Sequence, residues 1–355
     1  TAADFEAQMD RVGAIAGATA EEMEALTATA LELGASTSKS ASEVAQGMEL
    51  MAAMGFSALQ VIDAMPGVIA AAEASGEDMA LVAETMASAL NAFGLEASEA
   101  SRVADVLAQT ANVSAAGIRD MQYAFKYAAP VAKTLGISLE ELSAAIAIMA
   151  NNGIRGEQAG TTLRAALLRL VDPPKEAAAM LKQLGVEVVD AQGRFRPFNE
   201  IIADLAKATA NMTNAQKDAA LATIFGTEAM SGMLTVIEAG PDKLNELTKA
   251  LENSAGASAE AAAKMKDNLQ GALEELGGSI ETAQIAIGSA LSPAIRQIAE
   301  FIQTLVDAFN SLPEGAKQFI AFGTAITGAV MGLVTVFGIL MVAFGSVLSS
   351  IGTIT

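Results

Sequence analysis

Apolar side chains recur along most of this sequence at the three- and four-residue spacing of amphipathic helices. The apolar runs stop at glycines, which can close a helix in the left-handed conformation without a Cβ clash. These glycines are Gly34, Gly55, Gly76, Gly94, Gly136, Gly153, Gly185 and Gly240. The pattern predicts a series of helices of about 12 to 20 residues each.

Helix starts are marked by capping boxes, in which a hydroxyl and a Glu or Gln three residues later satisfy first-turn amides reciprocally. Five pairs have this form: Thr19/Glu22, Ser40/Glu43, Ser57/Gln60, Ser138/Glu141 and Thr213/Gln216. First helical turns are the expected place for Pro66, Pro241, Pro293 and Pro313, because proline lacks an amide that would be unpaired there anyway. Pro130, inside YAFKYAAPVAKTLG, predicts a kink or a break.

A weak internal repeat accompanies these signals. GLEASEASRVADVLAQ from Gly94 aligns with GISLEELSAAIAIMAN from Gly136, 42 residues later. SASEVAQGMELMAAMGF from Ser40 aligns with SLEELSAAIAIMANNGI from Ser138, 98 residues later. The first spacing suits stacked helical hairpins of roughly 40 residues. A true duplication and a similarity due to alanine-rich composition are both compatible with these alignments.

One short region predicts β structure. In VEVVDAQGRFRPF, β-branched and aromatic residues flank a turn that begins at Asp190 and ends at Gly193, whose glycine supplies positive φ. We expect a small β-hairpin near 186–198 that packs on its neighbours, because an isolated hairpin is only marginally stable in water. A flap over a helix edge explains this hairpin better than a binding site does.

Long amphipathic helices are expected after residue 256. Six apolar residues follow the 3-4-3-4-3 spacing of a coiled-coil seam: Ile295, Ile298, Ile302, Leu305, Phe309 and Leu312. The seam is a candidate for self-association. Its roughly two and a half heptads also suit an ordinary helix packed within its own chain.

Lys317 is the last charged residue, and the segment 318–355 contains an apolar window longer than the roughly 18 residues that a membrane helix needs. Gly328 and Gly332 form a small-xxx-small face that lets helices approach closely. The residues predicted to insert are Ile326, Gly328, Gly332, Leu333, Val336, Phe337 and Leu340. The alternative is a helix buried in a large assembly. No cluster of Lys or Arg and no belt of Trp or Tyr flanks the segment, which favours a helix that is sheltered first and inserted later.

These signals predict four parts: an N-terminal lead-in at 1–18, a helical core at 19–256, long amphipathic helices at 257–317 and a hydrophobic, membrane-competent segment at 318–355. Composition agrees, since 52% of the residues are apolar but only 4% aromatic, and alanine is the strongest helix former. The predicted fold class is all-α: an array of antiparallel helical hairpins with one small β-hairpin, followed by long helices and the hydrophobic segment.

Candidate chemistry is sparse. The chain has no cysteine and no histidine, which excludes disulfides, thiolate nucleophiles, imidazole bases and nearly all transition-metal sites. Adjacent acids at Glu21/Glu22, Glu140/Glu141 and Glu274/Glu275 point about 100° apart on a helix, so they do not converge on one atom. They are expected at helix starts or on exposed faces, and Arg164 and Arg169 as solvated or ion-paired flanks of an apolar face. We expect no catalytic, metal or cofactor-binding residues and no enzymatic activity.

Charge narrows the choice of partners. The formal net charge is −20, which disfavours binding to phosphate backbones, so no specific nucleic-acid binding is expected. The beginning, TAADFEAQMD, has no basic stretch followed by an apolar run, and no secretory signal is expected there.

From about Ala25 to Phe322 the sequence resembles the phage tail tape measure proteins. The resemblance rests on blocks in the family's order and spacing, among them ALTATALELGASTSKSASEVAQGMELMAAMGF, AMPGVIAAAEASGEDMALVAETMASALNAFGLEASEASRVADVLA, KYAAPVAKTLGISLEELSAAIAIMANNGIRGEQAGTTLRAALLRL, LGVEVVDAQGRFRPFNEIIADLA, ALATIFGTEAMSGMLTVIEAGPDKLNELTKALENS and AIGSALSPAIRQIAE. Each block alone is an alanine-rich helix, and together they are specific.

The resemblance implies a virion protein of the tail lumen. Such a protein is assembled in the host cytoplasm as a homo-oligomer with tail-tube and tail-tip proteins, sets tail length, and enters the host membrane during genome ejection. Some members carry peptidoglycan-cleaving domains, and this sequence shows none. It is also much shorter than most full tape measures, so it is expected to be a fragment. Two alternatives from other classes are a membrane-active or pore-forming helical effector and a helical-repeat adaptor, which should not need residues 318–355.

Overall fold

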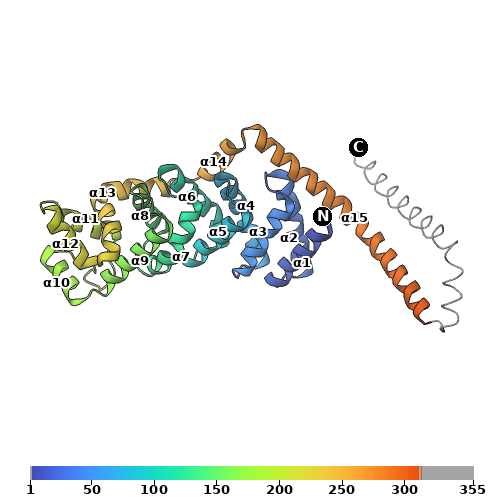
Figure 1. Cartoon of the computed structure of the whole chain (residues 1–355), viewed down its shortest axis with the longest axis horizontal. Helices are drawn as coiled ribbons and strands as arrows, with labels where there is room; N and C mark the ends of the chain where they lie inside the picture. Colours follow the sequence, from blue (N-terminus) through green and yellow to red (C-terminus); the bar gives the residue numbers. More distant parts are fainter. Residues whose placement is uncertain (1, 312, 314–355) are drawn as a thin grey trace. The chain divides into compact units, whose positions relative to one another are not determined.

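The computed structural model describes residues 2–311 and 313, and its regular structure is helical (Figure 1), which confirms the all-α prediction. The helices, with one short 3-10 turn η1, are α1 (Ala2–Ala16), α2 (Ala20–Ser36), α3 (Ala41–Ala53), α4 (Ala58–Ser75), α5 (Met79–Phe93), η1 (Ala97–Glu99), α6 (Ala100–Val113), α7 (Ile118–Thr134), α8 (Leu139–Asn151), α9 (Gly156–Val171), α10 (Lys175–Leu184), α11 (Phe198–Thr209), α12 (Asn214–Phe225), α13 (Thr227–Glu252), α14 (Ala257–Lys266) and α15 (Leu269–Asn310).

The described residues form two compact units. Residues 8–279 make up the first, which we call the helical array, and residues 2–7 and 280–311 belong to the second. The array holds α2 to α14 and the first turns of α15, so it contains most of the buried core.

Helices two apart in sequence pack side by side in the array. One row consists of α2, α4, α6 and α8, the other of α3, α5, α7 and α9, and consecutive helices join the rows as antiparallel hairpins. The helices of the second row begin at residues 41, 79, 118 and 156, so the repeating unit is 38 or 39 residues long. This arrangement confirms the predicted array of helical hairpins.

The two sequence alignments have different structural outcomes. The alignment at a spacing of 42 superimposes α6 on α8, two neighbours that occupy equivalent places in one row. The alignment at 98 matches α3 with α8, which lie in different rows. The second similarity is therefore one of composition and amphipathic pattern.

Glycines allow the closest helix crossings. A Cβ built on Gly67 of α4 would lie 2.6 Å from the carbonyl carbon of Ala100 in α6, and one on Gly160 of α9 would lie 2.7 Å from Cα of Ala124 in α7. The predicted helix end at Gly34 is wrong for a related reason. Helix α2 continues to Ser36, and Gly34 is buried where its Cβ would meet the backbone nitrogen of Ala41 at 2.5 Å.

Most of the other predicted glycine stops are confirmed. Gly76, Gly94 and Gly185 are left-handed C-caps, and Gly240, with φ 81°, breaks α13 so that Pro241 begins its second half. Two proline predictions are wrong. Pro66 lies inside α4 and Pro293 inside α15, where tertiary packing and helix length outweigh the local preference. Helix α7 continues through Pro130 without a break.

The chain turns back after α12. Helix α13 packs on α8, α9, α11 and α12, and α14 then lies against α4 and α6. The predicted β-hairpin near 186–198 does not form strands in the described region. A single antiparallel bridge joins Val189 and Phe195 around a turn closed by the bond from Gly193 N to Asp190 O at 2.9 Å. The residues on either side of this turn instead provide a carbonyl that accepts a bond from Arg196 and lead into the start of α11.

Candidate functional site

Helix α15 carries an exposed apolar stripe. It is 42 residues long, which corresponds to about 63 Å of helix. We define the α15 stripe by its exposed apolar residues: Leu269, Leu273, Leu276, Ile280, Ile287, Ile295, Phe301, Ile302, Leu305 and Val306. At about 100° per residue these side chains cluster on one side of the helix, whereas Glu274, Arg296 and Asp307 lie on the other.

Three of the six predicted self-association residues belong to the C-terminal half of this stripe. Ile295, Ile302 and Leu305 are between 51% and 60% exposed, and Ile298 is half-buried. Phe309 belongs to α15, but its side chain lies outside the described part, as does Leu312. The stripe continues back to Leu269, so the exposed apolar surface is about twice as long as the sequence seam. The role of the six predicted residues in self-association stays a prediction.

The opposite face of α15 contacts the first turns of α1 within the second unit. Gly288, at the edge of the stripe, lies against Ala2, which leaves no room for a side chain there, and Arg296, on the opposite face, pairs with Glu6. Ile285, on this same side of the helix, is 1% exposed. The side of α15 that holds Ile285 and Arg296 is therefore partly covered by α1, whereas the residues that define the stripe are exposed.

The predicted membrane-insertion residues from Ile326 to Leu340 lie outside the described residues. Within the described ones, no single helix combines the length and hydropathy of a membrane span. Taken together, α12 and α13 have the length and hydropathy of a span, but the two helices are bent by 119° at the break between them. Most of the apolar side chains of this pair are buried in the array, which is the usual situation of a core helix pair.

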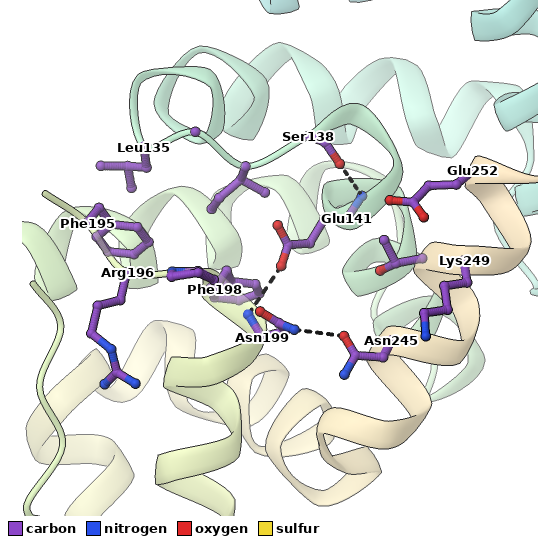
Figure 2. A pocket seen from close by; sticks show the side chains of 14 residues that line it. Leu135, Ser138, Glu141, Phe195, Arg196, Phe198, Asn199, Asn245, Lys249 and Glu252 are labelled. Atoms are coloured by element: carbon purple, nitrogen blue, oxygen red, sulfur yellow. Dashed lines mark hydrogen bonds between the residues drawn. The ribbon is translucent and has the colours of Figure 1, made fainter. Parts of the chain in front are cut away.

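A polar pocket of 410 Å³ lies where α8, α11 and α13 meet the segment around Arg196 (Figure 2). Glu141 points into it from the first turn of α8. Its Oε1 accepts a hydrogen bond of 3.2 Å from the backbone nitrogen of Asn199, at the start of α11. The Asn199 amide in turn donates to Oδ1 of Asn245 on α13 at 2.8 Å. The pocket thus joins three helices through one carboxylate and two amides.

Glu141 departs from its expected capping role. The other four predicted boxes are complete in both directions. Ser138 does accept a bond from Glu141 N at 3.1 Å, but the Glu141 side chain caps α11 instead of its own helix. Burial raises the pKa of the Glu141 carboxyl, the bond from Asn199 opposes this increase in part, and the nearby charge of Glu252 adds to it.

The preceding residue, Glu140, points elsewhere. It is 5% exposed and pairs with Arg102, which also bonds Glu99 through Nε at 2.6 Å. The two glutamates do not converge and both lie in the first turn of α8, as predicted, although Glu140 is buried there. Sequence could not reveal this burial, because Arg102 lies 38 residues upstream in the neighbouring helix of the row.

Two arginines have roles that sequence reasoning missed. Arg169 donates to the carbonyls of Ile224 at 2.8 Å and Thr223 at 3.0 Å, so it caps the C-terminus of α12. Arg196 bonds the Glu187 carbonyl at 2.7 Å and Asp204 at 2.8 Å, and so fastens the turn segment to α11. No local sequence signal distinguishes these arginines from solvated ones.

The polar groups around the pocket are engaged in holding helices. Among residues 2–311, no group of three or more acidic or other metal-ligating side chains comes together. The pocket's geometry is that of a cross-helix cap, which fixes the start of α11 and the end of α13 on α8.

Comparisons with known proteins bear on the whole chain. Residues 27–226 match the family model described as phage-related minor tail protein. The chain is 46% identical to the tape measure protein of Pneumococcus phage Dp-1, over 98% of the chain and 30% of that relative. It is 30% identical to the probable tape measure protein of Escherichia phage P2, over 94% of the chain and 41% of that relative.

A third relative, the probable tape measure protein of Clostridium phage phiCD119, is 25% identical over 89% of the chain and 34% of its own length. The chain therefore spans between 30% and 41% of the length of these relatives. No solved structure matches it.

Proposed function

Because the chain belongs to the phage-related minor tail protein family, we propose that it is a segment of a tape measure protein, which governs tail length and assembly and takes part in genome ejection. The observation that carries this proposal is the similarity over 98% of the chain to a protein named as a tape measure protein. The α15 stripe supports it, since a structural protein that assembles in several copies needs such a surface.

Self-association is the role proposed for α15. A single helix that exposes apolar residues over about five heptads is unusual in a monomer, and a second copy of the same helix provides a matching stripe. The proposed partners are further copies of the chain in the tail lumen, together with tail-tube and tail-tip proteins. The proposed location is the virion tail.

The helical array is proposed to be a folded assembly module, and the length-measuring part to lie elsewhere in the protein. A chain that folds back every 38 or 39 residues covers far less length than its residue count allows. The relatives are more than twice as long as the matched region, which leaves room for an extended segment.

The experiment is genetic and structural. A phage that encodes this chain should incorporate it in the tail, as shown by mass spectrometry of purified virions, and should make no normal tails when the gene is disrupted, as seen by electron microscopy. Complementation from a plasmid is the control. Tails of normal length and number in the disrupted phage would refute the proposal.

Entry of residues 318–355 into the host membrane is a separate part of the proposal. On an insertion scale each central Leu, Ile, Phe or Val contributes roughly −0.3 to −0.6 kcal/mol, and no charged residue opposes them in this segment. The full chain should therefore float with liposomes, whereas residues 1–317 should stay in the dense fraction. Equal flotation of both forms would exclude this role for the segment.

The absence of catalysis is also proposed, on the basis of a sequence without Cys and His and of a pocket that works as a helix cap. Incubation with purified peptidoglycan and with generic ester and peptide substrates tests this point. Turnover that persists after removal of contaminants would contradict it.

A further inference from the structure

We propose that α14 is a releasable strap, which fastens the start of α15 to α4 and α6 through two carboxylates and can open while the two helical rows stay folded. Its opening would convert residues 253–268, between α13 and α15, into a tether. This inference rests on contacts within the array and is independent of the tape measure assignment.

The first carboxylate is Asp105 of α6. It is 8% exposed, and it accepts bonds from Gly256 N at 2.9 Å, Ser258 N at 2.9 Å and Ser258 Oγ at 2.6 Å. These donors form the N-terminus of α14, more than 150 residues away in sequence. A buried carboxylate with three donors is a strong and specific attachment, because charge-assisted bonds are about twice as strong as neutral ones.

The second carboxylate is Glu73, at the end of α4, whose side chain is 6% exposed. Glu73 accepts a bond from Ser38 N at 2.8 Å. It also pairs with Lys266, the last residue of α14, at 3.1 Å. Lys266 also lies 3.5 Å from Glu275 in the first turns of α15. The two carboxylates therefore hold both ends of the strap, and the second also reaches α15.

Little apolar burial supports α14 between these two attachments. Only Ser258 and Ala262 of its ten residues are buried, and Met265 is 52% exposed. Helix α8, in the middle of the array, buries 11 of its 13 residues. Elements with few buried apolar contacts open at lower free energy than the core, so α14 should open before the helices beneath it.

Opening would change the reach of the chain. The 16 residues from 253 to 268 would span at most about 53 Å when extended, at roughly 3.3 Å per residue. The first turns of α15 add an exposed bond from Ser279 Oγ to the Ala35 carbonyl at 3.3 Å, which is long and solvent-accessible. The start of α15 would then be held to the helical rows through α2, where Gly278 is buried against Gly34.

Hydrogen exchange of the full 355-residue chain, resolved by peptide mass spectrometry, tests the strap. In the unmodified protein, amides of 254–266 should exchange at least about 10-fold faster than those of α8. Asp105→Asn keeps the shape of the side chain but removes its charge. It should accelerate amide exchange in 254–266 by a further 10- to 100-fold or so and leave exchange in α8 and α9 unchanged. Asp63→Asn, an exposed aspartate on α4, is the matched control and should change neither region.

Two results would overturn the proposal. One is protection of α14 equal to that of α8 in the unmodified chain, and the other is acceleration of α8 and α14 together in Asp105→Asn, which would mean that α14 opens only with the array. If Asp105→Asn does not fold, Ser258→Ala removes the 2.6 Å bond and leaves the carboxylate in place. It should then accelerate exchange in 254–266 alone, and no acceleration there would also overturn the proposal.

Discussion

At the scale of single residues, small side chains and a few buried polar groups decide how closely the helices of the array approach. Gly160 and Gly67 sit at crossings where backbone meets backbone. Ser143, in the middle of α8, is fully buried, and its Oγ is the one buried side-chain polar atom of the described residues without a hydrogen-bond partner. Substitution by alanine should therefore change the stability of the array in opposite directions at the glycine crossings and at Ser143.

Gly160→Ala should destabilise the array. The new Cβ would lie 2.7 Å from backbone atoms of Ala124, and backbone cannot move aside as a flexible side chain can. Overpacking of this kind costs about 1–3 kcal/mol, more than the gain of up to about 1 kcal/mol from better helix propensity. Urea denaturation measures the difference. Gly277→Ala, where no atom lies within 4 Å of the added Cβ, is the control and should be neutral or stabilising.

Ser143→Ala should leave stability unchanged or raise it by about 1 kcal/mol, because a buried hydroxyl without a partner carries an uncompensated desolvation cost. The same denaturation experiment applies. The matched control is Ser114→Ala, which removes a hydroxyl that donates to the Thr110 carbonyl at 2.7 Å and accepts from Ala116 N at 3.1 Å, and which should cost about 1 kcal/mol. A larger loss at Ser143 than at Ser114 would contradict the argument.

Glu141→Gln should be more favourable for stability at pH 8 than at pH 5. Burial raises the pKa of Glu141 in the folded state, so the folded protein holds this proton more tightly than the unfolded chain does. The stability contributed by this group is therefore lost as the pH rises from the ordinary glutamate pKa, about 4.3, through the raised value. Glutamine cannot titrate and keeps an oxygen for Asn199 N, so its advantage over glutamate should grow with pH.

Glu22→Gln provides a control whose difference from the parent should be the same at pH 5 and pH 8, because the carboxyl of Glu22 titrates below both pH values. Hydrogen bonds from Thr19 lower the pKa of Glu22 in its complete capping box, so its contribution is present above the unfolded pKa and lost as the pH falls through the folded one. Denaturation midpoints of both variants and the parent, at the two pH values, supply the comparison. A pH-independent difference for Glu141→Gln would show that its carboxyl is not perturbed.

At the scale of helices, sequence predicted what is local. Helix existence, four complete capping boxes and most glycine caps follow from residues within one or two turns of each other. The failures share a different cause. Gly34 is required by its close contact with Ala41 in the next helix, and the side chain of Glu141 accepts a bond from Asn199, 58 residues later. A tertiary partner of that kind leaves no trace in local spacing.

The same limit explains the α15 stripe. The spacing from Ile295 to Leu312 indicated a seam, but periodicity alone could not say whether the chain covers it. The structure shows the described residues of the seam exposed or half-buried, and it extends the apolar surface to Leu269. The Asp105 attachment of α14 was equally invisible, because a lone aspartate in an amphipathic helix has no signature.

Substitution of Ile302 and Leu305 by serine should weaken self-association of residues 1–317. Both side chains are exposed, at 51% and 53%, so their removal should spare the fold of one copy. Burial of such a side chain contributes about 1.5–3 kcal/mol, and the pair should raise the dissociation constant by at least 100-fold or so. Sedimentation equilibrium measures this constant. Serines at Gln303 and Thr304, on the polar side, are the control; a monomeric parent, or equal association of both variants, would contradict the role of the stripe.

At the scale of the whole molecule, the helical array bears on whether this part of the chain measures the length of the tail. Removing residues 95–136 deletes η1, α6 and α7, one hairpin of 42 residues, and joins the turn at Gly94 to the start of α8. If this region were an extended helical ruler, the tail should shorten by about 63 Å. In a stacked array one hairpin advances only about 8–10 Å, the spacing of packed helices, so even a perfectly re-formed array would shorten the protein by far less.

Re-formation is itself disfavoured by what the deletion removes. Helix α7 packs between α5 and α9, α6 packs between α4 and α8, and Asp105 anchors α14. We therefore predict that phage with this deletion assemble few tails or are not infectious, as counted by electron microscopy and plaque titre. A deletion of 42 residues in the proposed length-measuring part outside this chain is the control and should shorten tails in proportion. Viable particles uniformly shorter by about 63 Å after removal of 95–136 would show that this region is extended in the tail, because no loss of one stacked hairpin reaches that distance.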